Sequence, residues 1–311
     1  MAILGGTGFI GSHLVQVLVR EGVEVTVVSR HLNIRSKDSA QGLVSYAQWD
    51  GSSVQALVPI VEMVDAVVNL VGEGIADKRW TPDRKASILS SRINTANALY
   101  LAIVQASTKP EVVVQASAIG YYGYKYERKE RIEVDEYSES GVGFLAEVCK
   151  QWEEAILPVE SIIPRLVVVR SGVVLGNKGG LIKKLTPIFK LGLGGVVGAG
   201  YQPFSWIHIE DEVGAIAHLV RDRSARGVYN LVAPNPCTYR SFVKDFGRAL
   251  HRPVVLAIPT WAIRLLFGAE MANEVFLGGK EVVPRRLLES GYSFKYPLLM
   301  DALEKLRMEN L

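Results

Sequence analysis

The sequence predicts a doubly wound parallel α/β sheet of the Rossmann type with a smaller, mostly helical carboxyl-terminal lobe. Short β-rich runs alternate with helical stretches over the first two thirds of the chain, and a glycine-rich turn directly follows the first run. Strands are expected at residues 2–4, 24–28, 44–49, 66–69, 112–116 and 166–170. Helices are expected at 10–21, 54–61, 82–107 and 144–157, because apolar residues recur there every three or four positions.

The alternation of strands and helices becomes less regular after residue 170. A helix at 211–221 and a strand at 229–232 are followed by short helices at 239–250, 261–267 and 298–306, with little strand. We therefore predict a nucleotide-binding domain at 1–233, of which 171–212 contributes to the substrate lobe, and a small domain at 234–311. This lobe is expected over the carboxyl ends of the strands, where open α/β sheets bind ligands.

Composition narrows the possible partners. The 311 residues are 49% hydrophobic, and 35 basic against 32 acidic residues leave a net charge of +3. This balance predicts a large core and neither a nucleic-acid nor a membrane partner. Cys149 and Cys237 have no metal-ligand spacing, and there is no long apolar run or signal peptide. A soluble, cytoplasmic protein without a metal site is expected.

The glycine-rich turn runs Gly5-Gly6-Thr7-Gly8-Phe9-Ile10-Gly11 and opens a helix. In such a turn Gly5 permits the tight bend, Gly8 lets a pyrophosphate approach the backbone, and Gly11 lets the helix pack on the strand. The amino terminus of the helix stabilises the phosphate charge. A dinucleotide site is predicted, and the alternative is a glycine turn without a ligand.

The end of the second strand indicates which dinucleotide binds. NAD-binding proteins usually carry an acidic residue there, whereas this chain has Ser29-Arg30-His31. A hydroxyl beside a guanidinium suits a 2′-phosphate, so NADP(H) is the predicted cofactor. The alternative is a solvated surface arginine. The fourth strand ends in Asn69-Leu70-Val71-Gly72, which places a segment with little side-chain bulk on the adenine side of the cofactor. Arg92 on the next helix could reach the cofactor if its face turns inward; the alternative, commoner for a lone helical arginine, is a solvated cation.

Eight segments spread over almost the whole chain form a specific combination. They are GGTGFIG at 5–11, NLVGE at 69–73, ADKRW at 76–80, SAIGYYG at 117–123, FLAEVCKQWE at 144–153, RSGVVLG at 170–176, WIHIED at 206–211 and GGKEVVPRRL at 278–287. Together they resemble the atypical extended short-chain dehydrogenases/reductases, and more closely the YfcH-like NAD(P)-binding proteins of the epimerase family.

This resemblance implies a Rossmann lobe that binds NADP(H), with a small-molecule substrate between the lobes. The residues implied to hold the cofactor are those from Gly5 to Gly11, Ser29, Arg30, Leu70, Val71, Arg92 and Lys150. Many relatives pair through a helix bundle, so a homodimer stays open.

Enzymes of this superfamily use a Ser or Thr together with a Tyr and a Lys spaced YxxxK on one helix. Residues four apart share a helix face, so the lysine can lower the pKa of the phenol, which then acts as acid or base. Lys150 fits the lysine place, but the residue four earlier is Ala146. Ser117 is the candidate serine, although a gapless alignment puts Ala118 there.

Tyr121 and Tyr122 follow Ser117 closely, so either could bring a phenol to the nicotinamide. The alternative is an aromatic wall that packs on the ligand, and for Lys150 it is an exposed helical lysine. His208 is a further candidate, although a histidine in an apolar alternation is more often a core residue.

Three other charged features are open to two interpretations. Glu73 and Arg79 either line the pocket mouth or form a surface salt bridge. The run at 284–286, Pro-Arg-Arg, is either an anion site or a solvated face.

These observations favour an NADP(H)-dependent oxidoreductase that acts on a small carbonyl or alcohol. Lys150 would orient the ribose, Ser117 would bind the reacting oxygen, and Tyr121 or Tyr122 would donate the proton. A nucleotide-sugar epimerase or dehydratase is the second hypothesis, and Ser29-Arg30 counts against it because that chemistry recycles a tightly bound NAD. The third is a non-catalytic NADP(H) sensor or scaffold, motivated by the missing tyrosine.

Overall fold

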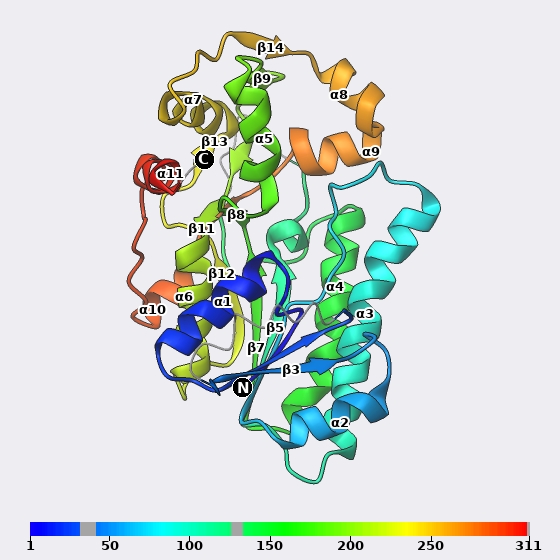
Figure 1. Cartoon of the computed structure of the whole chain (residues 1–311). Helices are drawn as coiled ribbons and strands as arrows, with labels where there is room; N and C mark the ends of the chain where they lie inside the picture. The colour runs from blue at the N-terminus through cyan, green and yellow to red at the C-terminus, as the bar shows by residue number, and fades with distance from the viewer. Residues whose placement is uncertain (32–41, 126–132, 310–311) are drawn as a thin grey trace.

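The computed structural model describes residues 1–31, 42–125 and 133–309, and its centre is a seven-stranded parallel sheet (Figure 1). The strands follow the order β12-β7-β5-β4-β1-β2-β3, in which the direction of winding reverses between β1 and β4. Their bounds are β1 Ala2–Leu4, β2 Val25–Ser29, β3 Val44–Gln48, β4 Ala66–Asn69, β5 Val112–Ala118, β7 Arg165–Ser171 and β12 Gly227–Leu231. The predicted doubly wound fold is confirmed.

Both faces of the sheet are buried under helices. α1 and α6 cover one face, and α2, α3 and α4 cover the other (Figure 1). Because side chains alternate along a strand, Ile3 and Val68 point to the first layer while Leu4 and Val67 point to the second. The helices are α1 Phe9–Arg20, α2 Val54–Glu62, α3 Pro82–Gln105, α4 Phe144–Ile156 and α6 Ile209–Arg221.

Local sequence sets where several helices begin. Ser53 caps α2 by accepting from the amide of Ala56, and Thr81 caps α3 by accepting from the amide of Arg84. Pro82 follows Thr81 at the first turn of α3, where its missing N–H costs nothing.

A second lobe lies above the sheet in Figure 1. Its core joins Phe189 and Trp206 to Phe242, Phe246 and Leu303, so it draws on two separate parts of the chain. Its helical elements are α5 Gly180–Lys190, α7 Tyr239–Ala249, α8 Thr260–Phe267, α9 Ala269–Met271, η4 Ala272–Leu277 and α11 Leu299–Met308. α10 Arg285–Glu289 instead packs beside β12, with Leu287 in the core of the first layer (Figure 1).

Four small two-stranded sheets accompany these helices, and the three strands described after residue 234 are short, in agreement with the expectation of little strand there. They pair β8 Val173–Leu175 with β11 Trp206–His208, β9 Gly195–Val197 with β14 Leu256–Ile258, β10 Pro203–Phe204 with β13 Cys237–Thr238, and β6 Glu133–Val134 with β15 Glu281–Val282. Each strand has only two or three residues, too few to leave a periodic signal.

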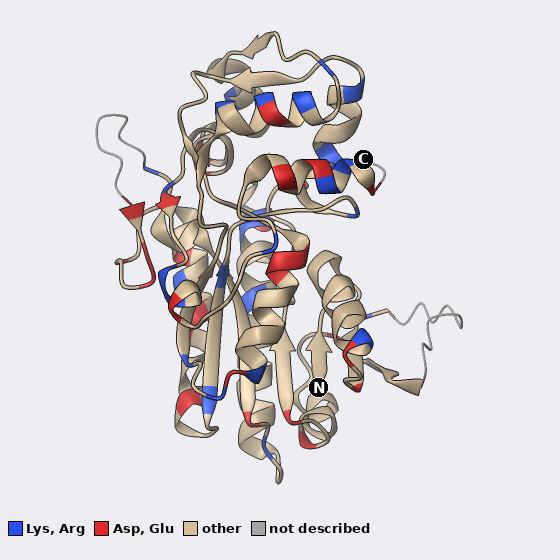
Figure 2. Cartoon of the chain, turned by 90° about the vertical axis from the view of Figure 1, so that its left-hand side faces the viewer, with Lys and Arg blue, Asp and Glu red and all other residues tan. Residues whose placement is uncertain are grey.

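Charged side chains of both signs are spread over both lobes (Figure 2). Within the described part of the chain, no helix combines the length and apolar character needed to cross a bilayer.

Candidate functional site

A cavity of about 620 Å³ lies at the carboxyl ends of β1, β4, β5 and β7, beneath the second lobe. The nucleotide-binding side contributes residues 5, 8–11, 70, 72–75, 92, 116–120, 123, 145, 148, 149, 152 and 171–174. The second lobe contributes residues 181, 202–205, 239, 274–276 and 278–280. The cavity therefore spans the switch point of the sheet, where ligands of such folds bind.

The glycine turn forms one end of this cavity. Gly5 has a φ of 79°, and the amide of Gly8 bonds the carbonyl of Gly5 at 2.9 Å. A Cβ at Gly11 would lie 2.4 Å from the carbonyl oxygen of Gly5, so only glycine allows α1 to pack this closely. The first amides of α1 have no partner within the helix and are available to an anion.

The far side of the turn reaches the end of β2. The hydroxyls of Thr7 and Ser29 lie 3.0 Å apart. Arg30 is exposed, and together with His31 it borders a second hollow of about 500 Å³. Asp50 also lines this hollow, but its Oδ1 accepts from the amides of Ser52 and Ser53, hydrogen bonds that lower the pKa of Asp50. Val71 is outside both hollows, and its amide donates to the Asn69 side chain.

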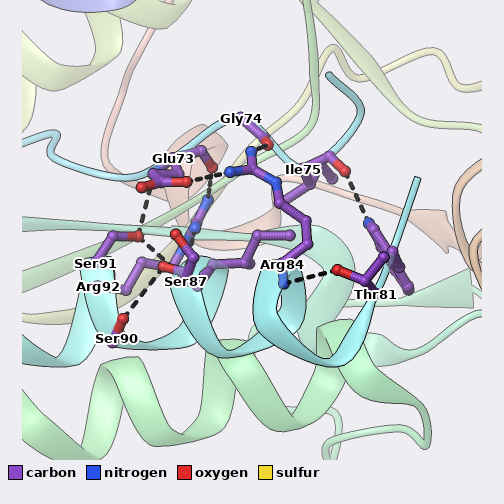
Figure 3. A network of polar contacts seen from close by, with 11 residues as sticks. Glu73, Gly74, Ile75, Thr81, Arg84, Ser87, Ser90, Ser91 and Arg92 are labelled. Atoms are coloured by element: carbon purple, nitrogen blue, oxygen red, sulfur yellow. Dashed lines mark hydrogen bonds and ion pairs between the residues drawn. The ribbon is translucent and has the colours of Figure 1, made fainter. Parts of the chain in front are cut away.

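Arg92 lies inside the cavity wall. Its Nη1 donates to the carbonyl of Ile88 at 2.9 Å and its Nη2 to that of Glu73 at 3.0 Å (Figure 3). A Cβ at Gly72 would come within 3.2 Å of the guanidinium, so a larger residue there would require Arg92 to shift. Arg92 thus lines the cavity from α3.

Glu73 also lines the cavity, and Figure 3 shows its carboxylate paired with Arg84. Of the two interpretations left open, Glu73 lines the cavity, whereas Arg79 lies against Gly268 and outside the cavity lining. The ion-pair partner of Glu73 is Arg84 in the first turn of α3, not Arg79.

Ser117 is buried at the end of β5 and lines the middle of the cavity. Its hydroxyl donates to the carboxylate of Glu153 at 2.6 Å. Arg170 holds the same carboxylate through Nε at 2.8 Å and Nη2 at 2.7 Å. A bidentate contact of this kind fixes the carboxylate of Glu153 in place.

The two tyrosines after Ser117 belong to this network and are not among the cavity-lining residues. The hydroxyl of Tyr122 accepts from Arg170 at 3.0 Å and donates to Asn230 at 2.8 Å, and burial raises the pKa of Tyr122 to about 12. The ring of Tyr121 lies 3.3 Å under the guanidinium of Arg170. Both tyrosines pack around Arg170 outside the cavity lining, so this placement fits neither the proton-donor interpretation nor that of an aromatic wall on the ligand.

The structure does not bring Lys150 to the site. Lys150 is exposed, and the face of α4 toward the cavity carries Leu145, Val148, Cys149 and Trp152. One residue along a helix turns the side chain by about 100°, which directs Lys150 away. Two pairs four apart line the cavity, Leu145 with Cys149 and Val148 with Trp152, and burial raises the pKa of Cys149 to about 11.

Comparison with known proteins defines the family. The profile of the NAD dependent epimerase/dehydratase family matches residues 1–231, well over half of the chain. This chain belongs to that family. A domain of unknown function, DUF1731, matches residues 258–306.

Individual relatives of this family member are similar along their whole length. The chain is 37% identical to the epimerase family protein Mb2239 of Mycobacterium bovis, covering 97% of this chain and 96% of that protein. It is 36% identical to the epimerase family protein SSP1921 of Staphylococcus saprophyticus, covering 98% of each. Human epimerase family protein SDR39U1, solved with NADPH, superposes with a TM-score of 0.86 at 36% identity over 100% of both chains.

The glycine turn of this family member fits a dinucleotide. The close approaches at Gly5 and Gly11 leave no room for side chains, and the amides of α1 face the same cavity. Residues 5–11 would hold the pyrophosphate, and Arg92 would face the bound nucleotide.

Several residues of the second lobe were not found by sequence reasoning. Glu274 caps α4, since its carboxylate accepts from the amides of Phe144 and Leu145, both at 2.8 Å. Tyr239 and Lys280 also line the cavity. No sequence spacing indicates that these residues approach the sheet. The only local signal is the Gly278-Gly279 pair before Lys280, which indicates a turn.

The remaining candidates have structural roles. The Nδ1 of His208 accepts from the amide of Glu210 and caps α6, while burial lowers the pKa of His208 to about 4. Arg285 pairs with Asp135 at 2.7 Å, and Arg286 donates to backbone carbonyls of residues 226 and 228. Arg285 is exposed, in agreement with the interpretation as a solvated face, while Arg286 is held by the backbone.

Proposed function

We propose that this chain is an NADP(H)-dependent oxidoreductase that transfers hydride to or from a small carbonyl or alcohol. The observation that carries the proposal is one continuous cavity, which runs from the glycine turn past Ser117 into the second lobe. Membership of the epimerase/dehydratase family supports a nicotinamide cofactor, which supplies the hydride chemistry when bound.

The choice of NADP(H) over NAD(H) is supported by the end of β2. Ser29 and Arg30 stand where an acidic residue would recognise a ribose hydroxyl. The hydroxyl and the guanidinium can bind a phosphate by charge-assisted hydrogen bonds. The similar human protein, solved with NADPH, is consistent with this preference.

Ser117 is the proposed contact to the reacting oxygen. Because its proton is donated to Glu153, its oxygen can accept a hydrogen bond from an alcohol in the cavity. In alcohol oxidation the substrate proton passes to Ser117 while the serine proton passes to Glu153, and carbonyl reduction reverses both transfers. Arg170 positions Glu153 for this exchange.

One observation favours a second candidate, a protein that binds NADP(H) without turnover. α4 presents Leu145, Val148, Cys149 and Trp152 to the cavity, so this face of the helix carries no tyrosine to act as the acid and no lysine to bind the ribose. The epimerase or dehydratase alternative would keep NAD tightly bound, and Ser29-Arg30 counts against it.

A carbonyl-reductase panel separates these functions. We expect the purified chain to oxidise NADPH with at least one small aldehyde, ketone or oxo acid. With that substrate, it should oxidise NADPH faster than it oxidises NADH. Micromolar or tighter NADPH binding with no turnover on the panel would favour the non-catalytic protein. Copurified NAD together with conversion of a nucleotide sugar would favour the epimerase.

A further inference from the structure

We propose that the substrate of this site carries a carboxylate and that Lys280 pairs with it. The inference rests on the proposed function and deepens it by naming the substrate class. Four charged side chains line the cavity among the described residues: Glu73, Arg92, Glu274 and Lys280. Their partners show which charge is left for a ligand.

The carboxylates of Glu73 and Glu274 both have partners within the protein. Glu73 forms an ion pair with Arg84, and Glu274 accepts from two backbone amides at the start of α4. Arg92 donates to two backbone carbonyls. Within the described part of the chain, the ammonium of Lys280 has no hydrogen bond or ion pair, although the residue is half-buried. A partly desolvated cation facing a cavity is most stable when an anion joins it there.

The backbone of Lys280 is held firmly. Its carbonyl accepts from the hydroxyl of Ser205 at 3.0 Å, and that hydroxyl accepts from the amide of Val282 at 3.0 Å. The amide of Gly279 donates to the carbonyl of Tyr124 at 3.0 Å. These contacts fix the start of the side chain before any ligand arrives.

The same contacts place Lys280 on the Ser117 side of the cavity. Tyr124 follows β5, the strand that carries Ser117, and β15 beside Lys280 pairs with β6, which precedes α4. The glycine turn follows β1, and β4 separates β1 from β5 in the sheet. Lys280 is therefore suited to the substrate rather than to the pyrophosphate.

The surroundings of Lys280 describe the rest of the substrate. Hydrophobic side chains from both lobes dominate the wall: Leu145, Val148, Leu181, Phe204, Val275 and Phe276. The amide of Gln202 donates to the carbonyl of Phe276, so that donor is engaged. The Tyr239 hydroxyl has no partner within the described residues, and burial raises the pKa of Tyr239 to about 12, so it remains a donor. A hydrocarbon body with one carboxylate, such as an oxo or hydroxy acid, fits this set.

Two probes of nearly equal shape test the charge. Hexanoate and its neutral amide, hexanamide, are titrated by calorimetry into the full chain saturated with NADP⁺. We expect hexanoate to bind at least about tenfold more tightly, a difference of about 1.4 kcal/mol. Lys280→Gln should remove the difference and Lys280→Arg should keep it. Lys183→Gln is the matched control, because Lys183 is an exposed lysine of the same lobe outside the cavity.

Equal binding of the two probes, no binding of either, or a preference that survives Lys280→Gln overturns the proposal. A tenfold weaker Kd for NADPH in Lys280→Gln also overturns it, because Lys280 would then contact a cofactor phosphate. The probes are titrated without NADP⁺ as well. If the chain fails to bind NADP⁺, the proposed function fails, while the carboxylate preference is still measured on its own.

Discussion

Ser117 and Glu153 are joined by a 2.6 Å hydrogen bond between the end of β5 and the cavity side of α4. The serine lines the cavity, whereas the glutamate lies behind it in the fork of Arg170. A hydroxyl backed by a fixed carboxylate can exchange a proton with a ligand without either group moving.

Replacing Ser117 tests this role. Ser117→Ala should lower kcat about 100-fold or more with an active carbonyl substrate, the range expected for a lost acid–base group, and leave the Kd for NADPH within about twofold. Tyr122→Phe is the control and should retain most turnover, because its hydroxyl is bound to Asn230. Steady-state kinetics in which Tyr122→Phe loses turnover and Ser117→Ala keeps it would reverse the assignment.

Gly11→Ala tests the packing of the cofactor turn. Its Cβ would lie 2.4 Å from the carbonyl oxygen of Gly5, so the turn must shift. We expect a loss of about 1–3 kcal/mol in the free energy of unfolding and at least a tenfold weaker Kd for NADPH. Ser12→Ala, next along α1, should change neither by much. Unaltered NADPH binding in Gly11→Ala would contradict a pyrophosphate at this turn.

Because Arg170 and Glu153 form a buried ion pair, we expect their substitutions to have non-additive effects on the free energy of unfolding. Arg170→Met leaves the carboxylate without its cation, and Arg170 is only 3% exposed, so we expect a loss of about 3–5 kcal/mol in urea unfolding. Adding Glu153→Gln should cost less than the sum of the single changes, because the unpaired charge is gone. Strict additivity would mean that the two side chains do not stabilise each other.

Glu212 makes stability depend on pH. It is fully buried beneath the Ser171 hydroxyl, and burial raises the pKa of Glu212 from 4.5 to about 8. Between these values the folded chain keeps a proton that the unfolded chain releases, so the contribution of Glu212 to stability falls as pH rises. Glu212→Gln should gain stability over wild type progressively from about pH 5 to pH 8.

Chemical unfolding at several pH values measures this difference. Glu139→Gln, an exposed glutamate, should follow the wild-type profile throughout. Parallel profiles for wild type and Glu212→Gln would show that the carboxyl titrates normally in the folded chain.

Sequence reasoning recovered the fold because its signals are local. The valine-rich strands and the Gly5–Gly11 spacing need only neighbouring residues, and the predicted boundaries differ from the observed ones by no more than two residues. Local signals were not sufficient to place the residues of the site. Lys150 was expected to face the cofactor, yet a shift of one residue on α4 turns it outward and presents Cys149 instead.

The site residues of the second lobe could not be predicted from local sequence signals. Glu274 contacts Phe144 across 130 positions of sequence, and Lys280 reaches the cavity through a turn fixed by Tyr124. No periodicity encodes contacts of this length. His208 was correctly weighed toward a core role, but the cap that it forms on α6 depends on backbone geometry.

The Kd values for NADPH and NADH, measured side by side by fluorescence on wild type and on Arg30→Ala, test the central claim most directly. We predict that wild type binds NADPH at least about tenfold more tightly, because charge-assisted bonds to the 2′-phosphate contribute about 1.5–3 kcal/mol. Arg30→Ala should lose most of this preference and leave NADH binding unchanged. Equal or tighter binding of NADH by wild type would contradict the account.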